Sequence, residues 1–173
     1  MSCDELRTAE AAVAAGLREA GVVRGDRVGG FLPNCPEAII AMLAATSIGA
    51  TWSSCSPDFG VNGVVDRFGQ IEPKVLFAAD GYYYNGKRID SRPVARGIAA
   101  AIPSIDTVVI APFLEEGDGP GEGCVAWDDF YVPGQALTFE PVPFDHPLYI
   151  MYSSGTTGVP KCIVHGHGGS LLQ

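Results

Sequence analysis

The sequence has few basic residues and no long apolar run, and these absences exclude several classes of protein. Its 173 residues include 11 Lys and Arg against 20 Asp and Glu, a net charge of −9, whereas nucleic-acid-binding domains carry clustered positive charge. No stretch reaches the roughly 18 consecutive apolar residues of a membrane-spanning helix. The first residues, MSCDELRTAE, carry charge where a signal peptide has its apolar segment. We therefore expect a soluble, cytoplasmic protein with no nucleic-acid or membrane partner.

Cysteine is also scarce and is spaced without any CxxC pair. An odd number of widely separated cysteines argues against a disulfide framework and against a thiolate zinc site. We expect free thiols in a reducing compartment. The five cysteines are Cys3, Cys35, Cys55, Cys124 and Cys162.

The length of 173 residues suggests one domain. Helical and strand-like patterns alternate along its first two-thirds. The segments that predict helices are 4–20, 37–48, 60–70 and 92–102, with Gly21 and Gly49 ending the first two. The segments that predict strands are 28–32, 50–54, 74–79 and 107–111. This order is typical of βαβ crossovers. We expect an α/β fold with a doubly wound, mostly parallel sheet covered on both faces.

The pattern fails over residues 112–147, which hold eight acidic residues, six prolines, five glycines and no Lys or Arg. We interpret this acidic, Pro/Gly-rich stretch as a solvated surface excursion rather than a recognition tail. Order returns with a predicted strand at 147–152 and a β-prone run at 162–164. Ser170 then looks like the cap of a helix that has only begun at the last residue, Gln173. We expect the chain to be an internal piece of a larger protein.

Residues 153–161, SSGTTGVPK, carry the most informative chemistry. Four hydroxyls, two glycines and one lysine in nine residues suit a polyphosphate ligand. Glycines let successive backbone N–H groups face an anion, hydroxyls add donors, and Lys161 adds a mobile positive charge. The segment is not a Walker motif, because no GK[ST] follows at the required spacing. Composition alone leaves an ordinary Gly/Ser/Thr turn as the alternative.

The order of these residues resembles a known signature. YSSGTTGVPKCIVH is similar to the phosphate-binding signature [ST]-[ST]-G-[ST]-[ST]-G-x-P-K of the adenylate-forming superfamily, with Cys162 where most members have Gly or Ala. Upstream, GDRVGGFLPNCPEAIIAMLAATSIGA resembles a second segment of the same superfamily. The resemblance covers nearly the whole chain and is weakest over 112–147.

Three further strings resemble one branch of the superfamily, the acyl-CoA synthetases that activate acetoacetate. They are ATWSSCSPDFG, VVDRFGQIEPKVLF and IVHGHGG. Acetyl- and propionyl-CoA synthetases usually read GAVHSVVFGGFS at the first of these places. Another short-chain acyl-CoA synthetase, or a non-catalytic nucleotide-binding remnant, stays open as an alternative.

The resemblance implies a ligase that makes an acyl-adenylate and pyrophosphate from acetoacetate and ATP, and then transfers the acyl group to CoA. It implies that the signature residues cradle the ATP phosphates, with Thr157 and Lys161 as the residues that carry catalysis. The implied phosphate-binding residues are Ser153, Ser154, Gly155, Thr156, Thr157, Gly158 and Lys161.

The resemblance also implies that 1–173 is part of a large N-terminal AMP-binding domain, and that the C-terminal domain is absent. The Glu that binds Mg²⁺, the Asp that holds the ribose, the adenine-stacking aromatic and the catalytic Lys of the C-terminal domain would all lie beyond Gln173. We accordingly expect no metal site in this chain, and no turnover by the chain alone.

Four residues outside the signature are weaker candidates. Lys87 and Arg88 belong to the predicted turn Asn85-Gly86-Lys87-Arg88. They form either a solvated hairpin tip or, by resemblance, a contact to CoA phosphates. Trp52 lines an acyl or CoA channel or is a core residue. His165 is a substrate-facing wall, by resemblance, or a packing residue.

Two other patterns are interpreted without a functional site. His165 and His167 would share a face if both lay on one strand, but no acidic residue is near in sequence to complete a metal site. Asp66 and Arg67 are interpreted as residues of a helix surface.

Overall fold

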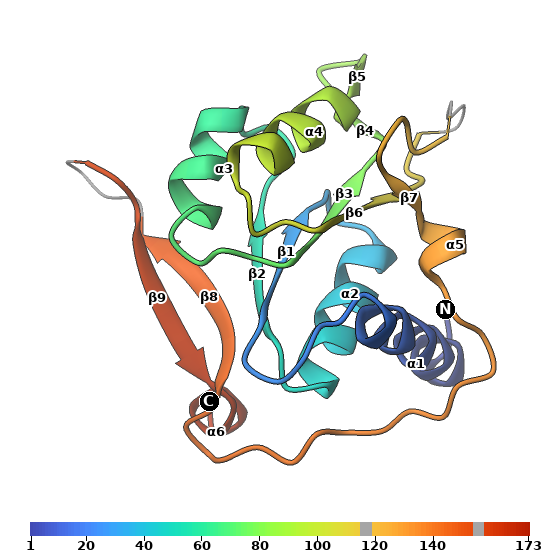
Figure 1. Ribbon diagram of the computed structural model, residues 1–173, viewed down its shortest axis with the longest axis vertical. Coiled ribbons are helices and arrows are strands. Elements are labelled where there is room, and N and C mark those ends of the chain that lie inside the picture. Colours follow the sequence, from blue (N-terminus) through green and yellow to red (C-terminus); the bar gives the residue numbers. More distant parts are fainter. Residues whose placement is uncertain (115–118, 154–157) are drawn as a thin grey trace.

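The computed structural model describes residues 1–114, 119–153 and 158–173, and its centre is a seven-stranded sheet (Figure 1). The strand order is β7-β6-β3-β1-β2-β8-β9, parallel throughout except that β9 runs antiparallel to β8. These strands are β1 (Arg27–Phe31), β2 (Thr51–Cys55), β3 (Val75–Ala79), β6 (Thr107–Ala111), β7 (Val125–Ala126), β8 (Pro147–Ser153) and β9 (Lys161–Gly166). A separate antiparallel hairpin pairs β4 (Gly81–Tyr84) with β5 (Lys87–Asp90).

Helices cover both faces of the sheet, which confirms the doubly wound α/β prediction. The helices are α1 (Cys3–Glu19), α2 (Pro36–Ser47), α3 (Val61–Phe68), α4 (Arg92–Ala101), α5 (Trp127–Phe130) and α6 (His167–Leu171). Figure 1 shows α1, α2 and α5 on one side of the sheet and α3 and α4 on the other. Because β3 (VLFAA) and β6 (TVVIA) are covered on both faces, their sequences are apolar runs rather than alternating ones.

The central strand β3 shows how the two layers share the sheet. Val75 and Phe77 point into the core beneath α1 and α2, whereas Leu76 and Ala78 point into the core beneath α3 and α4. All four are fully buried. Because successive side chains on a strand point to opposite faces, one continuous apolar run fills both cores.

The predicted ends of the first two helices are confirmed. Ser2 and Glu5 form a reciprocal capping box at the start of α1. Gly21 and Gly49 follow α1 and α2 with φ of 75° each, a left-handed conformation that only glycine adopts without strain.

The order of the connections produces a crevice at one end of the sheet, where the parallel strands have their carboxyl ends. We call this end the carboxyl edge. The connection after β1 leads to α2 on one face, and the connection after β2 leads to α3 on the other, so the two loops diverge. In open α/β sheets ligands bind at such a point. Strand β8 runs parallel to β2, so its last residue, Ser153, reaches the same edge.

The prediction of a solvated excursion over 112–147 is wrong for two aromatic residues of this stretch. Trp127 and Phe130 of α5 are buried, and both pack edge-on against Phe77, at ring-centroid distances of 5.7 and 5.4 Å. Two aromatic side chains from the acidic stretch therefore complete the core beneath α1. Burial of these large apolar side chains stabilises the fold, while the acidic side chains beside them stay in water.

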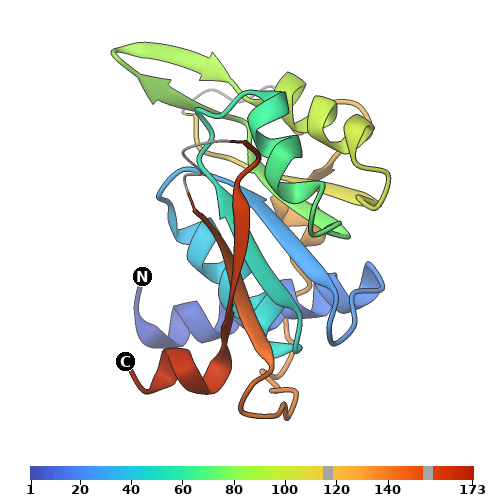
Figure 2. The ribbon, with the colours of Figure 1, turned by 90° about the vertical axis from the view of Figure 1, so that its left-hand side faces the viewer.

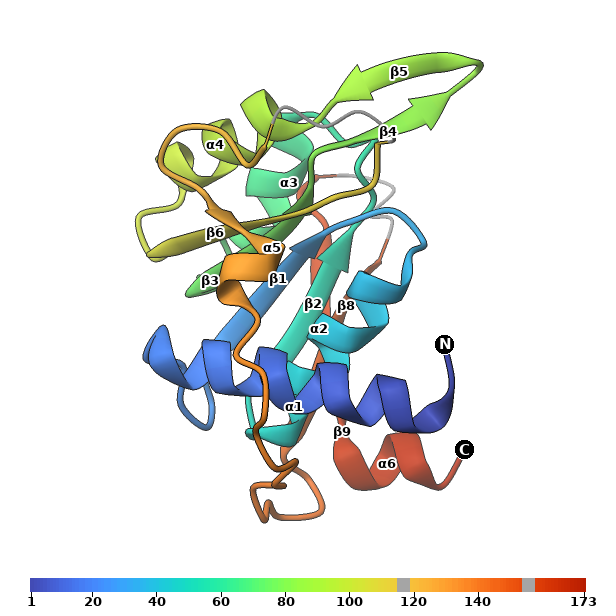
Figure 3. The same cartoon turned by 90° about the vertical axis from the view of Figure 1, so that its right-hand side faces the viewer.

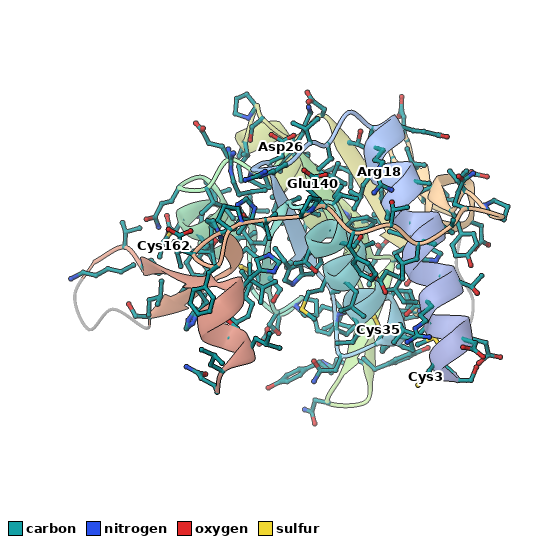
Figure 4. The ribbon with its side chains drawn as sticks, turned by 90° about the horizontal axis from the view of Figure 1, so that it is seen from below. Cys3, Arg18, Asp26, Cys35, Glu140 and Cys162 are labelled. Carbon is teal, nitrogen blue, oxygen red and sulfur yellow. The ribbon has the colours of Figure 1, made fainter. Side chains whose placement is uncertain are left out.

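The stretch that follows α5 is also tied to the body of the protein. Arg18 of α1 donates to the Thr138 hydroxyl (3.1 Å), and the Glu140 backbone N–H donates to the Ser47 carbonyl (2.7 Å). Figure 4 shows Arg18 on α1 and Glu140 on the strand-free segment that runs past α2.

The last helix begins earlier than the sequence predicts. α6 starts at His167, with Gly166 as its N-cap and no side-chain cap, so the prediction of a Ser170 cap is wrong. Figure 2 shows α6 continuing from the foot of β9. Gly168 packs so closely on Phe144 that a Cβ there would lie 2.2 Å from the ring. Because His167 lies on this helix, it does not share a strand face with His165. No helix among the described residues has the length and apolarity to cross a membrane.

Candidate functional site

A cavity of about 560 Å³ opens at the carboxyl edge, where the loops after β1 and β2 diverge. Its wall combines apolar side chains of α2, the two loops, and aromatic residues of β4 and the segment after β6. Figure 3 shows the β4–β5 hairpin extending past the carboxyl ends of β1 and β2. The lining residues are Leu32, Pro33, Asn34, Ala38, Ile39, Met42, Trp52, Ser54, Cys55, Ser56, Pro57, Tyr82, Tyr83 and Phe113.

Trp52 belongs both to the core and to the cavity wall. Its side chain is buried, lies 6.5 Å from the Phe77 ring between centroids, and covers Gly30. Trp52 also belongs to the residues that line the cavity. Its place in the core is thus confirmed, and its role in an acyl or CoA channel stays a prediction.

His165 lies at the other end of the β8–β9 hairpin from the signature. It pairs with Tyr149, and the two rings stack with centroids 4.9 Å apart. The pair formed by Ser153 and Lys161 is four register positions away, roughly 13 Å along the strand. Within the described residues, the contacts of His165 are those of a packing residue.

Lys87 and Arg88 lie exposed on β5, across the hairpin from the aromatic residues that face the cavity. Arg88 pairs with Tyr83, and Lys87 pairs with Tyr84. Tyr82 and Tyr83 line the cavity, whereas the two cations do not. The predicted hairpin is confirmed, and it places the two cations on the strand that pairs with the one carrying Tyr82 and Tyr83.

The ends of the signature meet at the carboxyl edge. Ser153 closes β8 and Lys161 opens β9, and they form the last register pair of the hairpin. Gly158 has φ of 102°, which a residue with a Cβ rarely adopts. The predictions for Ser154, Gly155, Thr156 and Thr157 lie outside the described residues.

Arg67 is a contact residue of the signature hairpin, so its interpretation as a helix-surface residue is wrong. It is half-buried, and its guanidinium carbon lies 4.5 Å from the centroid of the Phe59 ring and 5.8 Å from that of Tyr152. Burial raises the pKa of the Tyr152 hydroxyl above its usual range.

Asp80, which follows β3, is a second residue whose role was not predicted. Its buried carboxylate accepts hydrogen bonds from the backbone N–H groups of Phe113 (2.9 Å) and Leu114 (3.1 Å). These bonds satisfy a buried charge and fix the segment that brings Phe113 to the cavity.

Burial disfavours the thiolate form of two cysteines at the cavity and its flank. Burial raises the pKa of Cys55 to about 12 and that of Cys35 to about 11. All five cysteines are free, and Figure 4 shows Cys162 far across the molecule from Cys3 and Cys35. Among the described residues, no three His, Cys, Asp or Glu side chains gather as a metal site would require.

Comparison with known proteins shows the family to which this chain belongs. Residues 1–173 match the AMP-binding enzyme family, and the chain belongs to that family. Within it, the chain is 51% identical to acetoacetyl-coenzyme A synthetase of Rhizobium meliloti over 180 residues, covering 100% of this chain and 27% of that protein. The expected superfamily and branch are thus confirmed.

Two further relatives extend the comparison. The solved structure of acetoacetyl-CoA synthetase from Streptomyces lividans superimposes with a TM-score of 0.91 at 46% identity, over 98% of this chain and 26% of that one. Malonamoyl-CoA synthetase of Penicillium aethiopicum is 42% identical over 91% of this chain and 23% of its own length. The chain therefore spans about a quarter of the length of these relatives.

Proposed function

We propose that the protein containing this chain is an acid–thiol ligase that joins acetoacetate to CoA through an acyl-adenylate, releasing AMP and pyrophosphate. The observation that carries the proposal is the signature SSGTTGVPK at the carboxyl edge of the sheet, with Ser153 and Lys161 paired at its ends. The 51% identity to an acetoacetyl-coenzyme A synthetase supports the acid.

In the first step, the signature would act on the leaving group. Attack of the carboxylate on the α-phosphorus moves negative charge onto pyrophosphate, and donors placed beforehand stabilise that charge. Ser153, Gly158 and the residues between them would donate to the β- and γ-phosphates, with Thr156 and Thr157 as the main hydroxyl donors. Lys161 is exposed and would follow the departing charge as a flexible counter-ion.

In the second step, the cavity would hold part of CoA. A volume of about 560 Å³ with aromatic walls suits a nucleotide. Lys87 and Arg88 stand across the hairpin from Tyr83 and Tyr84, where they could reach the phosphates of a ligand seated in the cavity. Mg²⁺ would neutralise phosphate charge, held by residues that the family resemblance locates outside this chain.

The names of the relatives also bear on the acid. Acetoacetate and malonamate, the acid of malonamoyl-CoA, are short and share a carbonyl at carbon 3. Malonamate is therefore the second candidate substrate, ahead of acetate or propionate. A nucleotide-binding protein without ligase activity is the alternative from another class.

Acid-dependent ATP–pyrophosphate exchange by the full-length protein tests the proposal. We expect exchange with acetoacetate to exceed exchange with malonamate, acetate and propionate, and thioester to form once CoA is added. Exchange that is fastest with malonamate would move the assignment to the second candidate. ATP binding without exchange for any of the four acids would contradict a ligase.

A further inference from the structure

The half of the β8–β9 hairpin that carries the signature has little support from the sheet. Strand β8 pairs with β2 only at Tyr149 and Ile150, whereas residues 151–153 pair with β9 alone. Among the described residues, β9 is an edge strand whose partner is β8. Ser153 and Lys161 therefore stand at the end of a two-stranded ribbon, and isolated ribbons are marginally stable.

Arg67 contacts β8, the first strand of this ribbon. Its guanidinium lies between the rings of Phe59 and Tyr152, within the range of a cation–π contact with each. It also donates to the Gly63 carbonyl of its own helix (2.6 Å), which fixes the direction of the side chain. Tyr152 directly precedes Ser153, and its hydroxyl lies 3.1 Å from the Ser53 hydroxyl on β2.

Gln70 contacts the start of β9, the second strand of this ribbon. Its Nε2 donates to the carbonyl of Pro160 (2.8 Å) and to the carbonyl of Asp66 (2.6 Å), so the same nitrogen joins the end of α3 to the signature. Its Oε1 accepts from the Cys162 thiol (3.5 Å). Pro160 and Cys162 flank Lys161 on both sides.

From these contacts we propose that Arg67 and Gln70 are positioning residues for the phosphate-binding segment. The two residues lie three positions apart at the end of α3. Arg67 contacts β8 and Gln70 contacts the start of β9, and together these contacts set the positions of Ser153 and Lys161 relative to the carboxyl edge. Cys162 takes part because its thiol donates a hydrogen bond to Gln70. Gly or Ala at this position has no side-chain donor and could not make that bond. The inference rests on the proposed function and deepens it.

The test is ATP–pyrophosphate exchange by the full-length protein and its Gln70→Met and Arg67→Met variants. We expect the KM for ATP to rise about three- to tenfold in each, the range that one or two lost contacts of this kind give. The KM for acetoacetate and thioester formation from preformed acyl-adenylate should stay within about twofold, because neither depends on the position of pyrophosphate.

Three other variants serve as controls. Gln135→Met changes an exposed glutamine between α5 and β8 and should match the wild type. Cys162→Ser keeps a donor to Gln70 and should stay near the wild type, whereas Cys162→Ala should share part of the Gln70→Met effect. If Gln70→Met does not fold, Arg67→Lys and Cys162→Ala carry the test.

Hydrogen–deuterium exchange gives a readout that needs no activity. The backbone amides of 161–166 should exchange faster in Gln70→Met than in Gln135→Met. An unchanged ATP KM together with unchanged amide exchange would overturn the inference. So would equal slowing of both half-reactions, which indicates general destabilisation. Failure of the proposed function is a separate outcome, because it appears as a wild-type protein without acid-dependent exchange.

Discussion

The indole of Trp52 on β2 lies directly against the backbone of Gly30 on β1, so closely that a Cβ on Gly30 would stand 2.4 Å from its Cζ2 atom. The absence of a side chain at Gly30 thus sets how deep the tryptophan sits. Since Trp52 also lines the cavity at the carboxyl edge, this contact joins the core to the candidate site.

Gly30→Ala is therefore expected to destabilise the protein by about 1–3 kcal/mol, the usual effect of overpacking a core. Urea unfolding followed by tryptophan fluorescence measures the loss. Gly169→Ala is the matched control, because a Cβ at this position would meet no atom within 4 Å. The substitution also replaces a helical glycine, in α6, by a residue that favours helix. Equal stability of the two variants would contradict the close contact.

Much of the layered fold could be predicted because it follows from local patterns. Apolar runs such as Val75–Ala79 mark strands buried on both faces, and Gly21 and Gly49 mark helix ends that need a positive φ. The signature also lies where predicted, between two strands.

The errors occur where contacts distant in sequence decide the structure. Trp127 and Phe130 are buried because Phe77 lies opposite them, and nothing in the acidic sequence around them indicates this. Arg67 looked like a surface residue because its partner Tyr152 is far along the chain. The start of α6 likewise lies beside a contact distant in sequence, that of Gly168 with Phe144.

The two cations of the β4–β5 hairpin give a prediction for the CoA step. Changing Lys87 and Arg88 together to Ala in the full-length protein should raise the KM for CoA about two- to thirtyfold, because each exposed ionic contact is worth about 0.2–1 kcal/mol. ATP–pyrophosphate exchange, which needs no CoA, should stay at the wild-type rate. A CoA dependence equal to that of the wild type would return both residues to a solvated hairpin tip.

His167 gives a prediction for pH dependence. Burial and, to a smaller extent, the neighbouring His146 lower its pKa below 6.5, and its ring lies 5.7 Å from that of His146. As the pH falls below 6.5, the unfolded chain binds a proton on this residue before the folded chain does, so folding is disfavoured.

The melting temperature of the full-length protein should therefore fall between about pH 7 and about pH 5, and should fall less in His167→Gln. Melting curves of both proteins across this range measure the difference. Parallel curves would show that protonation of His167 is not linked to folding.

The central claim is that the signature stabilises the departing pyrophosphate, and Lys161→Ala tests it most directly when the two half-reactions are measured separately. Loss of one donor from such a site typically costs about 10²–10³ in rate. The exposed Lys161 should fall at or below the lower end, and Thr157→Ala should cost as much or more. We predict slower acid-dependent ATP–pyrophosphate exchange, with thioester formation from preformed acyl-adenylate nearly unchanged. Equal slowing of both half-reactions would contradict the account, because the residue would then support the fold rather than the leaving group.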